Sequence, residues 1–259
     1  MATTVANMHT NARQLRLGAL LVALAMVLVP TSLRTARAAW PEETRIIGTS
    51  QNGREILAWR FGSGAKVVVA VGQIHGNERS GIAVAKKIAE NGTKPGYTLW
   101  VIDTLNPDGN AKNTRQNARG VDLNRNFPAY WKKQACPGKY CSGPVAGSES
   151  ETQAFMKFLD KVNPELVVFY HSVGNVVDAV KTGVGSYRAV QEYARVAKLR
   201  ATAVSCGPGG CTGNATQQVY ARDRAATGFV VELPCDNNCL STTTIKRHVT
   251  AFWAAAKAA

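Results

Sequence analysis

The sequence has no internal repeat, no low-complexity linker and no break in composition that would divide it into several domains. The apolar run near its start, residues 17–29, is shorter than the roughly 20 residues that a membrane-spanning helix needs. Acidic residues are few, 17 against 31 lysines and arginines, but the basic residues are scattered and no nucleic-acid-binding module is recognisable. These absences exclude a repeat protein, argue against nucleic acid as a partner, and leave a single globular domain as the simplest organisation.

Residues 1–38 have the features of an export signal. Arginines and no acidic residue precede the apolar run, and Ala-Arg-Ala at positions 36–38 offers the small-x-small pattern that signal peptidases recognise. We therefore expect a signal peptide over 1–38, a folded domain over 39–259, and export to the periplasm, the cell wall or the medium without stable membrane insertion. An uncleaved membrane anchor is the alternative. Removal of this signal, with its four arginines, lowers the formal charge from +14 to about +10, which suits anionic surroundings such as cell-wall polymers.

Six cysteines lie in three close pairs, all of them after the export signal. An even number of cysteines in an exported protein favours disulfide bonds, and pairing within each short loop is the simplest connectivity. The expected bonds are Cys136–Cys141, Cys206–Cys211 and Cys235–Cys239. A zinc site made of cysteines is the alternative, but none of the three spacings is C-x-x-C.

Apolar runs bounded by turn residues alternate with segments of helical periodicity. The predicted strands are 44–49, 54–61, 66–71, 97–102, 166–170 and 228–233. The predicted helices are 79–91, 149–162 with Ser148 as its cap, 186–199, and a last helix from 242. The first two strands flank Gln-Asn-Gly, a hairpin signal, so the sheet should be mixed. The sequence therefore predicts a single α/β domain whose mixed, mostly parallel sheet is flanked by helices.

Four side chains that can bind metal or transfer protons stand at the ends of predicted strands. His75 and Glu78 come just after the third strand, His171 directly after the fifth, and Glu232 near the end of the sixth. Ligands of open α/β sheets bind beyond the carboxyl ends of the strands, and two imidazoles with one carboxylate are an accepted ligand set for catalytic zinc. A lone H-x-x-E pattern is weak evidence, however, and Glu232 fits a general base or a structural partner of an arginine equally well.

The segment 106–128 is long and polar, contains three arginines, and is expected to lie between elements rather than on a helix. Arginine side chains bind carboxylates in a two-pronged fashion and can stabilise an oxyanion. A solvated loop would have the same composition, so composition does not decide between these interpretations.

Five blocks of the sequence form a pattern when they are taken together and in order. They are His75-Gly76-Asn77-Glu78, Asn106-Pro107-Asp108-Gly109, Gly-Val-Asp-Leu-Asn-Arg-Asn-Phe at 120–127, His171-Ser172 and Val-Glu-Leu-Pro at 231–234. The pattern resembles the zinc carboxypeptidase A superfamily, and most of all its short bacterial branch of murein peptide amidases. The resemblance extends over residues 67–234 and implies an enzyme with one zinc ion per chain that hydrolyses a peptide bond next to a free carboxylate.

The resemblance also implies a role for each residue around the metal. His75, Glu78 and His171 would ligate the zinc ion. Asp122 would orient His75, since a metal-bound histidine usually donates its other ring N–H to such a partner. Glu232 would act as the general base and then as the proton donor.

The arginine-rich segment takes its implied roles from the same resemblance. Asn124 and Arg125 would hold the free carboxylate of the substrate. Arg115 would polarise the scissile carbonyl group and stabilise the oxyanion, with Arg119 as an alternative because the spacing in this segment is loose.

One feature of the digestive carboxypeptidases, a mobile tyrosine upstream of the general base, has no convincing match. Tyr220 is close to Glu232 in the sequence, but the segment where that tyrosine would be expected holds Cys206 and Cys211 instead. This departure favours the branch that acts on wall peptides over an unrestricted carboxypeptidase.

The resemblance implies a peptide substrate, in particular the γ-D-glutamyl to meso-diaminopimelate bond of peptidoglycan stem peptides, and we expect a monomer. One alternative is a zinc amidohydrolase of the aspartoacylase and succinylglutamate desuccinylase group. That group shares blocks like His75-Gly76-Asn77-Glu78 and like the Asp-Leu-Asn-Arg of the third block. The second block and the export signal favour the peptidase. The other alternative is a wall-binding protein without activity, against which the presence of both histidines, both glutamates and the arginines argues.

Overall fold

The computed structural model describes residues 39–178, 185–203, 210, 212–237 and 239–259. The predicted signal peptide and the predicted Cys206–Cys211 bond lie outside these residues. Within them, no helix combines the length and the apolar composition needed to span a membrane.

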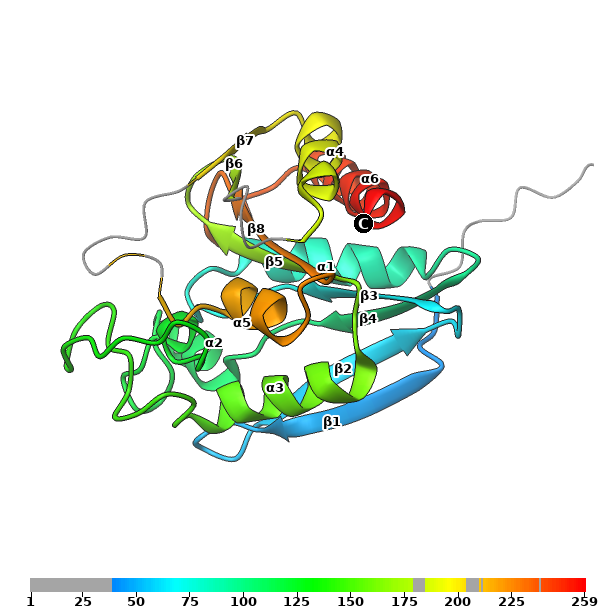
Figure 1. The fold of residues 1–259 in the computed structure, drawn as a ribbon. Helices are drawn as coiled ribbons and strands as arrows, with labels where there is room; N and C mark the ends of the chain where they lie inside the picture. Colours follow the sequence, from blue (N-terminus) through cyan, green and yellow to red (C-terminus); the bar gives the residue numbers. More distant parts are fainter. Residues whose placement is uncertain (1–38, 179–184, 204–209, 211, 238) are drawn as a thin grey trace, which may run out of the picture. The chain divides into compact units, whose positions relative to one another are not determined.

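Among the described residues, eight strands form one mixed sheet, with the order β1-β2-β4-β3-β5-β8-β6-β7 (Figure 1). The strands are β1 (Glu43–Thr49), β2 (Glu55–Phe61), β3 (Lys66–Val71), β4 (Tyr97–Ile102), β5 (Leu166–Ser172), β6 (Val176–Asp178), β7 (Arg200–Thr202) and β8 (Thr227–Leu233). The pairs β3–β4, β3–β5, β5–β8 and β6–β7 are parallel, while β1–β2, β2–β4 and β6–β8 are antiparallel. The predicted α/β fold with a mixed, mostly parallel sheet is therefore confirmed.

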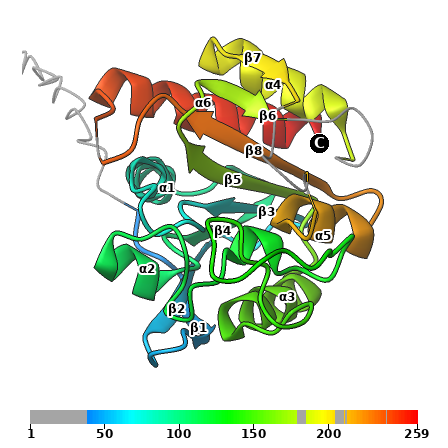
Figure 2. The ribbon, with the colours of Figure 1, turned by 90° about the vertical axis from the view of Figure 1, so that its left-hand side faces the viewer.

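Helices cover both faces of the sheet, as Figure 1 and the perpendicular view in Figure 2 show. The helices are α1 (Ser80–Asn91), α2 (Pro107–Lys112), α3 (Ser150–Val162), α4 (Tyr187–Ala197), α5 (Ala215–Arg222) and α6 (Thr242–Ala258), with a short 3₁₀ helix η1 (Leu123–Arg125). Side chains of α1, α4 and α6 share one apolar core, and side chains of α3 and α5 share the other. The central strands are thus buried on both faces.

Burial on both faces explains why the central strands are continuous apolar runs. Successive strand residues point to opposite sides of a sheet. Accordingly, Val68 and Ala70 of β3 belong to the core under α1, α4 and α6, while Val69 and Val71 belong to the core under α3 and α5. Such runs are typical of parallel strands that are covered by helices on both sides.

Three local predictions were wrong. The strand β5 ends at Ser172, so His171 lies within the strand rather than after it. The cap of helix α3 is Glu149, which makes no side-chain cap hydrogen bond, and not Ser148, whose hydroxyl donates to the Glu149 carboxylate (2.7 Å). The arginine-rich segment 106–128 is not free of helices, since α2 and η1 lie within it.

Two of the three predicted disulfide bonds lie among the described residues, and both are formed. Cys136 is bonded to Cys141 and Cys235 to Cys239. The first bond closes a loop between η1 and α3, and the second closes a loop directly after β8. Short loops gain little free energy of unfolding from a crosslink, so these bonds chiefly hold the conformation of two loops.

The last helix contains a buried histidine whose protonation affects stability. His248 is buried, and its Nδ1 lies 2.8 Å from the Tyr193 hydroxyl oxygen. Burial, with a smaller contribution from the charge of Arg247, lowers the pKa of His248 to about 4. In an unfolded chain the imidazole titrates near pH ~6.5. Between these two pH values the unfolded state therefore binds a proton that the native state does not.

We predict that this difference lowers the free energy of unfolding as the pH falls from about 6.5 to about 4, by up to about 3 kcal/mol. Chemical denaturation of the wild type and of His248→Gln at pH 7, 5.5 and 4.5 measures it. The variant should lose less stability than the wild type over this range, because glutamine does not titrate. An identical pH dependence of the two proteins would contradict the assignment.

Candidate active site

His75, Glu78 and His171 converge at the carboxyl ends of β3 and β5, which are neighbours in the sheet. His75 and Glu78 lie in the segment between β3 and α1, where the Glu78 N–H donates to the His75 carbonyl oxygen (3.0 Å) and closes a turn. His75 Nδ1 is 2.8 Å from Glu78 Oε1, and His171 Nδ1 is 2.8 Å from Glu78 Oε2. The two Nδ1 atoms are 3.1 Å apart. The structure thus brings the three predicted ligands together, and all three are buried.

The chemistry of these atoms fits a bound cation. His75 Nε2 lies 3.0 Å from Asp122 Oδ1, and since a carboxylate only accepts hydrogen bonds, Nε2 carries a proton. In neutral His75, the Nδ1 atom then carries a lone pair and no proton. This lone pair faces the Glu78 carboxylate and the imidazole of His171. Acceptor atoms so close together need a cation between them, either a proton or a metal ion. Among the described residues this is the one group of histidine, cysteine and acidic side chains that could hold a metal ion, and its composition suits zinc.

Asp122 and Arg115 surround the cluster from outside. Arg115 donates from Nε (3.1 Å) and Nη2 (2.9 Å) to Asp122 Oδ2, and from Nη1 to Glu78 Oε1 (3.2 Å). Burial alone would raise the pKa of Asp122 and of Glu78. Instead, the adjacent histidines hold the pKa of Glu78 well below its usual range, and His75 and Arg115 do the same for the pKa of Asp122. Burial alone would lower the pKa of His75, yet the two carboxylates outweigh it and raise that pKa. Both carboxylates are therefore ionised.

Glycines allow the first two sequence blocks to pack directly against each other. A Cβ atom on Gly76 would lie 2.0 Å from the carbonyl carbon of Gly109, which no side chain tolerates. Asn106 fixes the second block, because its Oδ1 accepts from the Gly109 N–H (2.8 Å) and its Nδ2 donates to the Arg115 carbonyl oxygen (3.3 Å). The second block therefore positions the turn that carries His75 and the chain that carries Arg115.

Glu232 lies opposite His171 in the parallel pair β5–β8. Burial raises the pKa of Glu232, and the negative charges of Glu78 and Asp178 add to this effect, while the two histidines of the cluster oppose it. Gly174 leaves room for the side chain, since a Cβ at that position would lie 2.7 Å from the Cβ of Glu232. A carboxylate with a raised pKa can accept a proton and release it again near neutral pH.

A cavity of about 270 Å³ opens beside the cluster. Its walls are formed by His75, Glu78, Arg115, Asn124, Arg125, Lys139, Tyr140, His171, Ser172, Val173, Asp178, Asn214, Thr216, Val230 and Glu232. Every catalytic, substrate-binding and metal-ligating residue that the sequence predicted is among them. The cavity joins the possible metal position to two arginine side chains and to the partly buried carboxylate of Glu232, an arrangement that can hydrolyse a bond near a negative group.

The sequence profile of the family described as "Zinc carboxypeptidase" matches residues 31–255, which is most of the chain. The chain belongs to the zinc carboxypeptidase family. The family implies zinc, and the histidine and carboxylate cluster described above fits that ion.

Two known proteins show how far the likeness extends. Murein peptide amidase A of Escherichia coli K12 is 30% identical over 154 residues, which cover 54% of this chain and 64% of that protein. This match spans a little under two thirds of the relative's length. The crystal structure of a murein-tripeptide amidase from Escherichia coli O157 has a TM-score of 0.62 at 22% identity and covers 86% of this chain and 94% of that chain. It establishes a shared fold.

The fold does not discriminate between the enzyme classes considered above. The structure of a succinylglutamate desuccinylase from Silicibacter sp. shares the fold as well, with a TM-score of 0.55 at 15% identity. The match covers 78% of this chain and 60% of that chain. The choice of reaction therefore depends on the side chains of the cavity.

In this member of the zinc carboxypeptidase family, η1 and the start of α5 fix the two residues predicted to bind a carboxylate, Asn124 and Arg125. The Ala215 N–H donates to Asn124 Oδ1 (2.9 Å), and Phe127 N–H donates to the Gly213 carbonyl oxygen (2.9 Å). Arg125 is buried, and its Nη1 donates to the Asn124 carbonyl oxygen (2.8 Å). Burial lowers the pKa of Arg125, which Asp122 partly offsets. A buried guanidinium group at a cavity wall is a strong position for binding a carboxylate.

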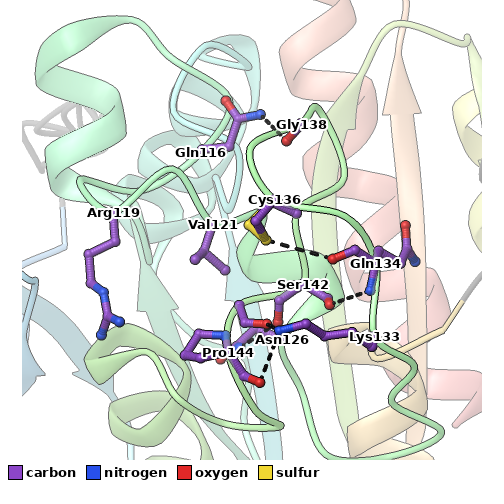
Figure 3. The surroundings of a disulfide bond; sticks show 12 residues. Gln116, Arg119, Val121, Asn126, Lys133, Gln134, Cys136, Gly138, Ser142 and Pro144 are labelled. Atoms are coloured by element: carbon purple, nitrogen blue, oxygen red, sulfur yellow. Dashed lines mark hydrogen bonds between the residues drawn. A yellow bond between two sulfur atoms is a disulfide. The ribbon is translucent and has the colours of Figure 1, made fainter.

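Arg119, the alternative to Arg115, points elsewhere. Its side chain is half-exposed, lies 3.8 Å from Glu149 and lines a second cavity beside Cys136 and Cys141 (Figure 3). Of the two arginines, only Arg115 reaches the cluster. Tyr220 is not among the residues that line the active-site cavity either, and its ring packs against Arg224 (4.7 Å).

Sequence reasoning missed Tyr140, which lines the cavity. The guanidinium carbons of Arg125 and Arg115 lie 5.2 and 5.5 Å from the centre of its ring. Its loop is closed by the disulfide and held by Gln116, whose amide donates to the carbonyl oxygens of Gly138 (3.3 Å; Figure 3) and Lys139 (3.1 Å). The one signal available was the position of Tyr140 directly before a bonded cysteine.

Proposed function

We propose that this chain is a zinc-dependent metallocarboxypeptidase that hydrolyses a peptide or isopeptide bond next to a free carboxylate. The observation that carries the proposal is that one and the same cavity joins the histidine and carboxylate cluster to Arg125 and Glu232. An arginine close to the cluster suits a substrate whose negative group lies close to the scissile bond.

His75, Glu78 and His171 would hold one zinc ion per chain, with Asp122 orienting His75 through its ring N–H. A zinc ion bound there lowers the pKa of a water molecule and polarises a carbonyl group. Glu232 takes a proton from the attacking water and gives it to the departing amine. Its position beside His171 and its raised pKa support this role.

The two arginines have different tasks in the proposed reaction. Arg115 stabilises the negative charge that develops on the carbonyl oxygen of the substrate, because it is held against the cluster by Asp122 and Glu78. Arg125, together with Asn124, binds the free carboxylate of the residue that is released. The buried environment of Arg125 strengthens its attraction for a carboxylate.

The proposed substrate is a peptidoglycan stem peptide, cut at the γ-D-glutamyl to meso-diaminopimelate bond. The likeness to murein peptide amidase A supports this choice, as do the two disulfide bonds, which suit an exported protein. We further propose a signal peptide over residues 1–38, a monomeric mature enzyme over 39–259, and a place of action outside the cytoplasm.

The free carboxylate is tested by comparing one stem peptide in its free-acid and amidated forms. The wild type should show a kcat/KM about two orders of magnitude lower for the amide, because Arg125 then loses its partner inside the cavity. Arg125→Ala should remove most of this preference. Arg125→Lys should restore only part of it, since lysine cannot make the two-pronged contact.

Arg119→Ala is the matched control, because Arg119 lies outside this cavity. This variant should prefer the free acid over the amide as strongly as the wild type does. Equal rates on the acid and the amide for the wild type would rule out a carboxypeptidase. Acyl amino acids belong in the same assay: faster turnover of those than of any peptide would favour the desuccinylase-like alternative.

A further inference from the structure

The ring of Tyr140 has three positive side chains around it. The guanidinium carbons of Arg125 and Arg115 lie 5.2 and 5.5 Å from the ring centre, and the Lys139 Nζ atom lies 5.4 Å from it. All four side chains line the active-site cavity. A cation within about 6 Å of an aromatic ring is attracted to the negative face of the ring. One neutral side chain therefore attracts three positive groups of the cavity wall.

The two arginines beside this ring repel each other. Burial lowers the pKa of Arg125, and the charge of Arg115 lowers it further, although Asp122 opposes the decrease. A carboxylate in the place of the Tyr140 ring would attract both guanidinium groups, but it would also occupy N–H donors and compete with a carboxylate of the substrate. The face of an aromatic ring attracts the guanidinium groups without this competition. The ring thus suits two arginines that both act on a substrate.

The backbone on both sides of Tyr140 is held by the segment that carries the arginines. Gln116 follows directly after one of them, and its side-chain amide donates to the carbonyl oxygen of Lys139 (3.1 Å). The Asp122 N–H donates to the carbonyl oxygen of Cys141 (2.8 Å), a residue that is itself in a disulfide bond. The residues directly before and after Tyr140 are therefore anchored, which gives the partly buried ring a fixed place in the wall.

We propose that Tyr140 is a positioning residue, whose ring holds Arg115 and Arg125 in the orientations in which one stabilises the oxyanion and the other binds the free carboxylate. The inference rests on the proposed function and assigns a further residue to that site. The ring carries this role rather than the hydroxyl group, because a cation is attracted to the aromatic face. Loss of the ring weakens both tasks at once, whereas loss of the hydroxyl group alone weakens neither.

The test compares Tyr140→Phe with Tyr140→Leu on one stem peptide in its free-acid and amidated forms. Tyr140→Phe keeps the ring and should stay within about twofold of the wild type in kcat and in KM. Tyr140→Leu should lower kcat about 3- to 30-fold, because Arg115 acts on the transition state. It should also lower the preference for the free acid by a similar factor, mainly by raising KM for the acid, because Arg125 binds the carboxylate.

A second background separates positioning from a general disturbance of the cavity. In Arg125→Ala the preference for the acid is already lost, so adding Tyr140→Leu should leave the ratio of acid to amide unchanged and still lower kcat. Tyr220→Leu is the matched control, because it also removes a ring that packs against an arginine, outside the residues that line the cavity. That variant should keep the wild-type kinetics. Zinc content and the melting temperature show whether each variant is folded.

Three results would overturn the inference while the wild type still prefers the free acid, and these leave the carboxypeptidase standing. The first is a Tyr140→Leu variant with wild-type kinetics. The second is a Tyr140→Phe variant that loses as much as Tyr140→Leu, which would mean that the hydroxyl group is the part required. The third is a further change of the acid-to-amide ratio in the Arg125→Ala background. A wild type that is indifferent to amidation would overturn the proposed function together with the inference.

Discussion

Glu232→Gln lowers kcat for peptide hydrolysis by about two to four orders of magnitude and leaves the zinc content unchanged. Glutamine has nearly the same shape as glutamate but cannot accept the proton of the attacking water. The ligand cluster is formed by His75, Glu78 and His171 without Glu232, so zinc should remain. Steady-state kinetics and metal analysis of the same preparation measure both effects.

Glu165→Gln provides the control for this substitution. Glu165 is an exposed carboxylate just before β5, and it is not among the residues that line the cavity. That variant should keep the wild-type rate. If Glu232→Gln itself keeps most of the wild-type rate, the general base lies elsewhere.

His75→Ala is expected to lose both zinc and hydrolysis, because a ligand and a link to Asp122 disappear together. Removing the metal from the wild type with a strong chelator should abolish hydrolysis in the same way, and added zinc should restore it. Asp122→Asn should retain the ligands but bind zinc about 10- to 100-fold more weakly, since His75 loses the carboxylate that orients its ring.

His248→Gln separates this effect from a general loss of histidine. His248 lies in α6 and contacts Tyr193, which belongs to the core shared by α1, α4 and α6. The His248→Gln variant should therefore change the stability of the protein but not its zinc content. A His75→Ala variant that still binds one zinc ion per chain and hydrolyses peptides would show that the metal is held by other residues.

The positions of the cluster could be predicted because strong local signals place them. The strands β3 and β4 have the predicted bounds, since each is a continuous apolar run between turn residues. Once those strands are placed, the rule that ligands bind at strand ends leads to His75 and Glu78. The strand β5 begins at the predicted residue, Leu166, and ends two residues later than predicted, but His171 still lies at its carboxyl end.

Other parts of the site have no comparable signal. The strands β6 and β7 have three residues each, which is too short for a periodic pattern, so Asp178 was not expected beside Glu232. The helix α2 has only six residues, although Asn106 as its cap and Pro107 in its first turn are a known start signal. Tyr140 reaches the cavity through a disulfide-closed loop, and such long-range contacts depend on the completed fold.

Mass spectrometry of the products from a defined stem peptide, with wild-type protein of known zinc content, identifies the bond that the enzyme cuts. We expect one cleavage, at the bond next to the terminal free carboxylate, that releases a single residue and requires about one zinc ion per chain. Cleavage at internal bonds, or the same products from protein shown to be free of metal, would contradict this expectation.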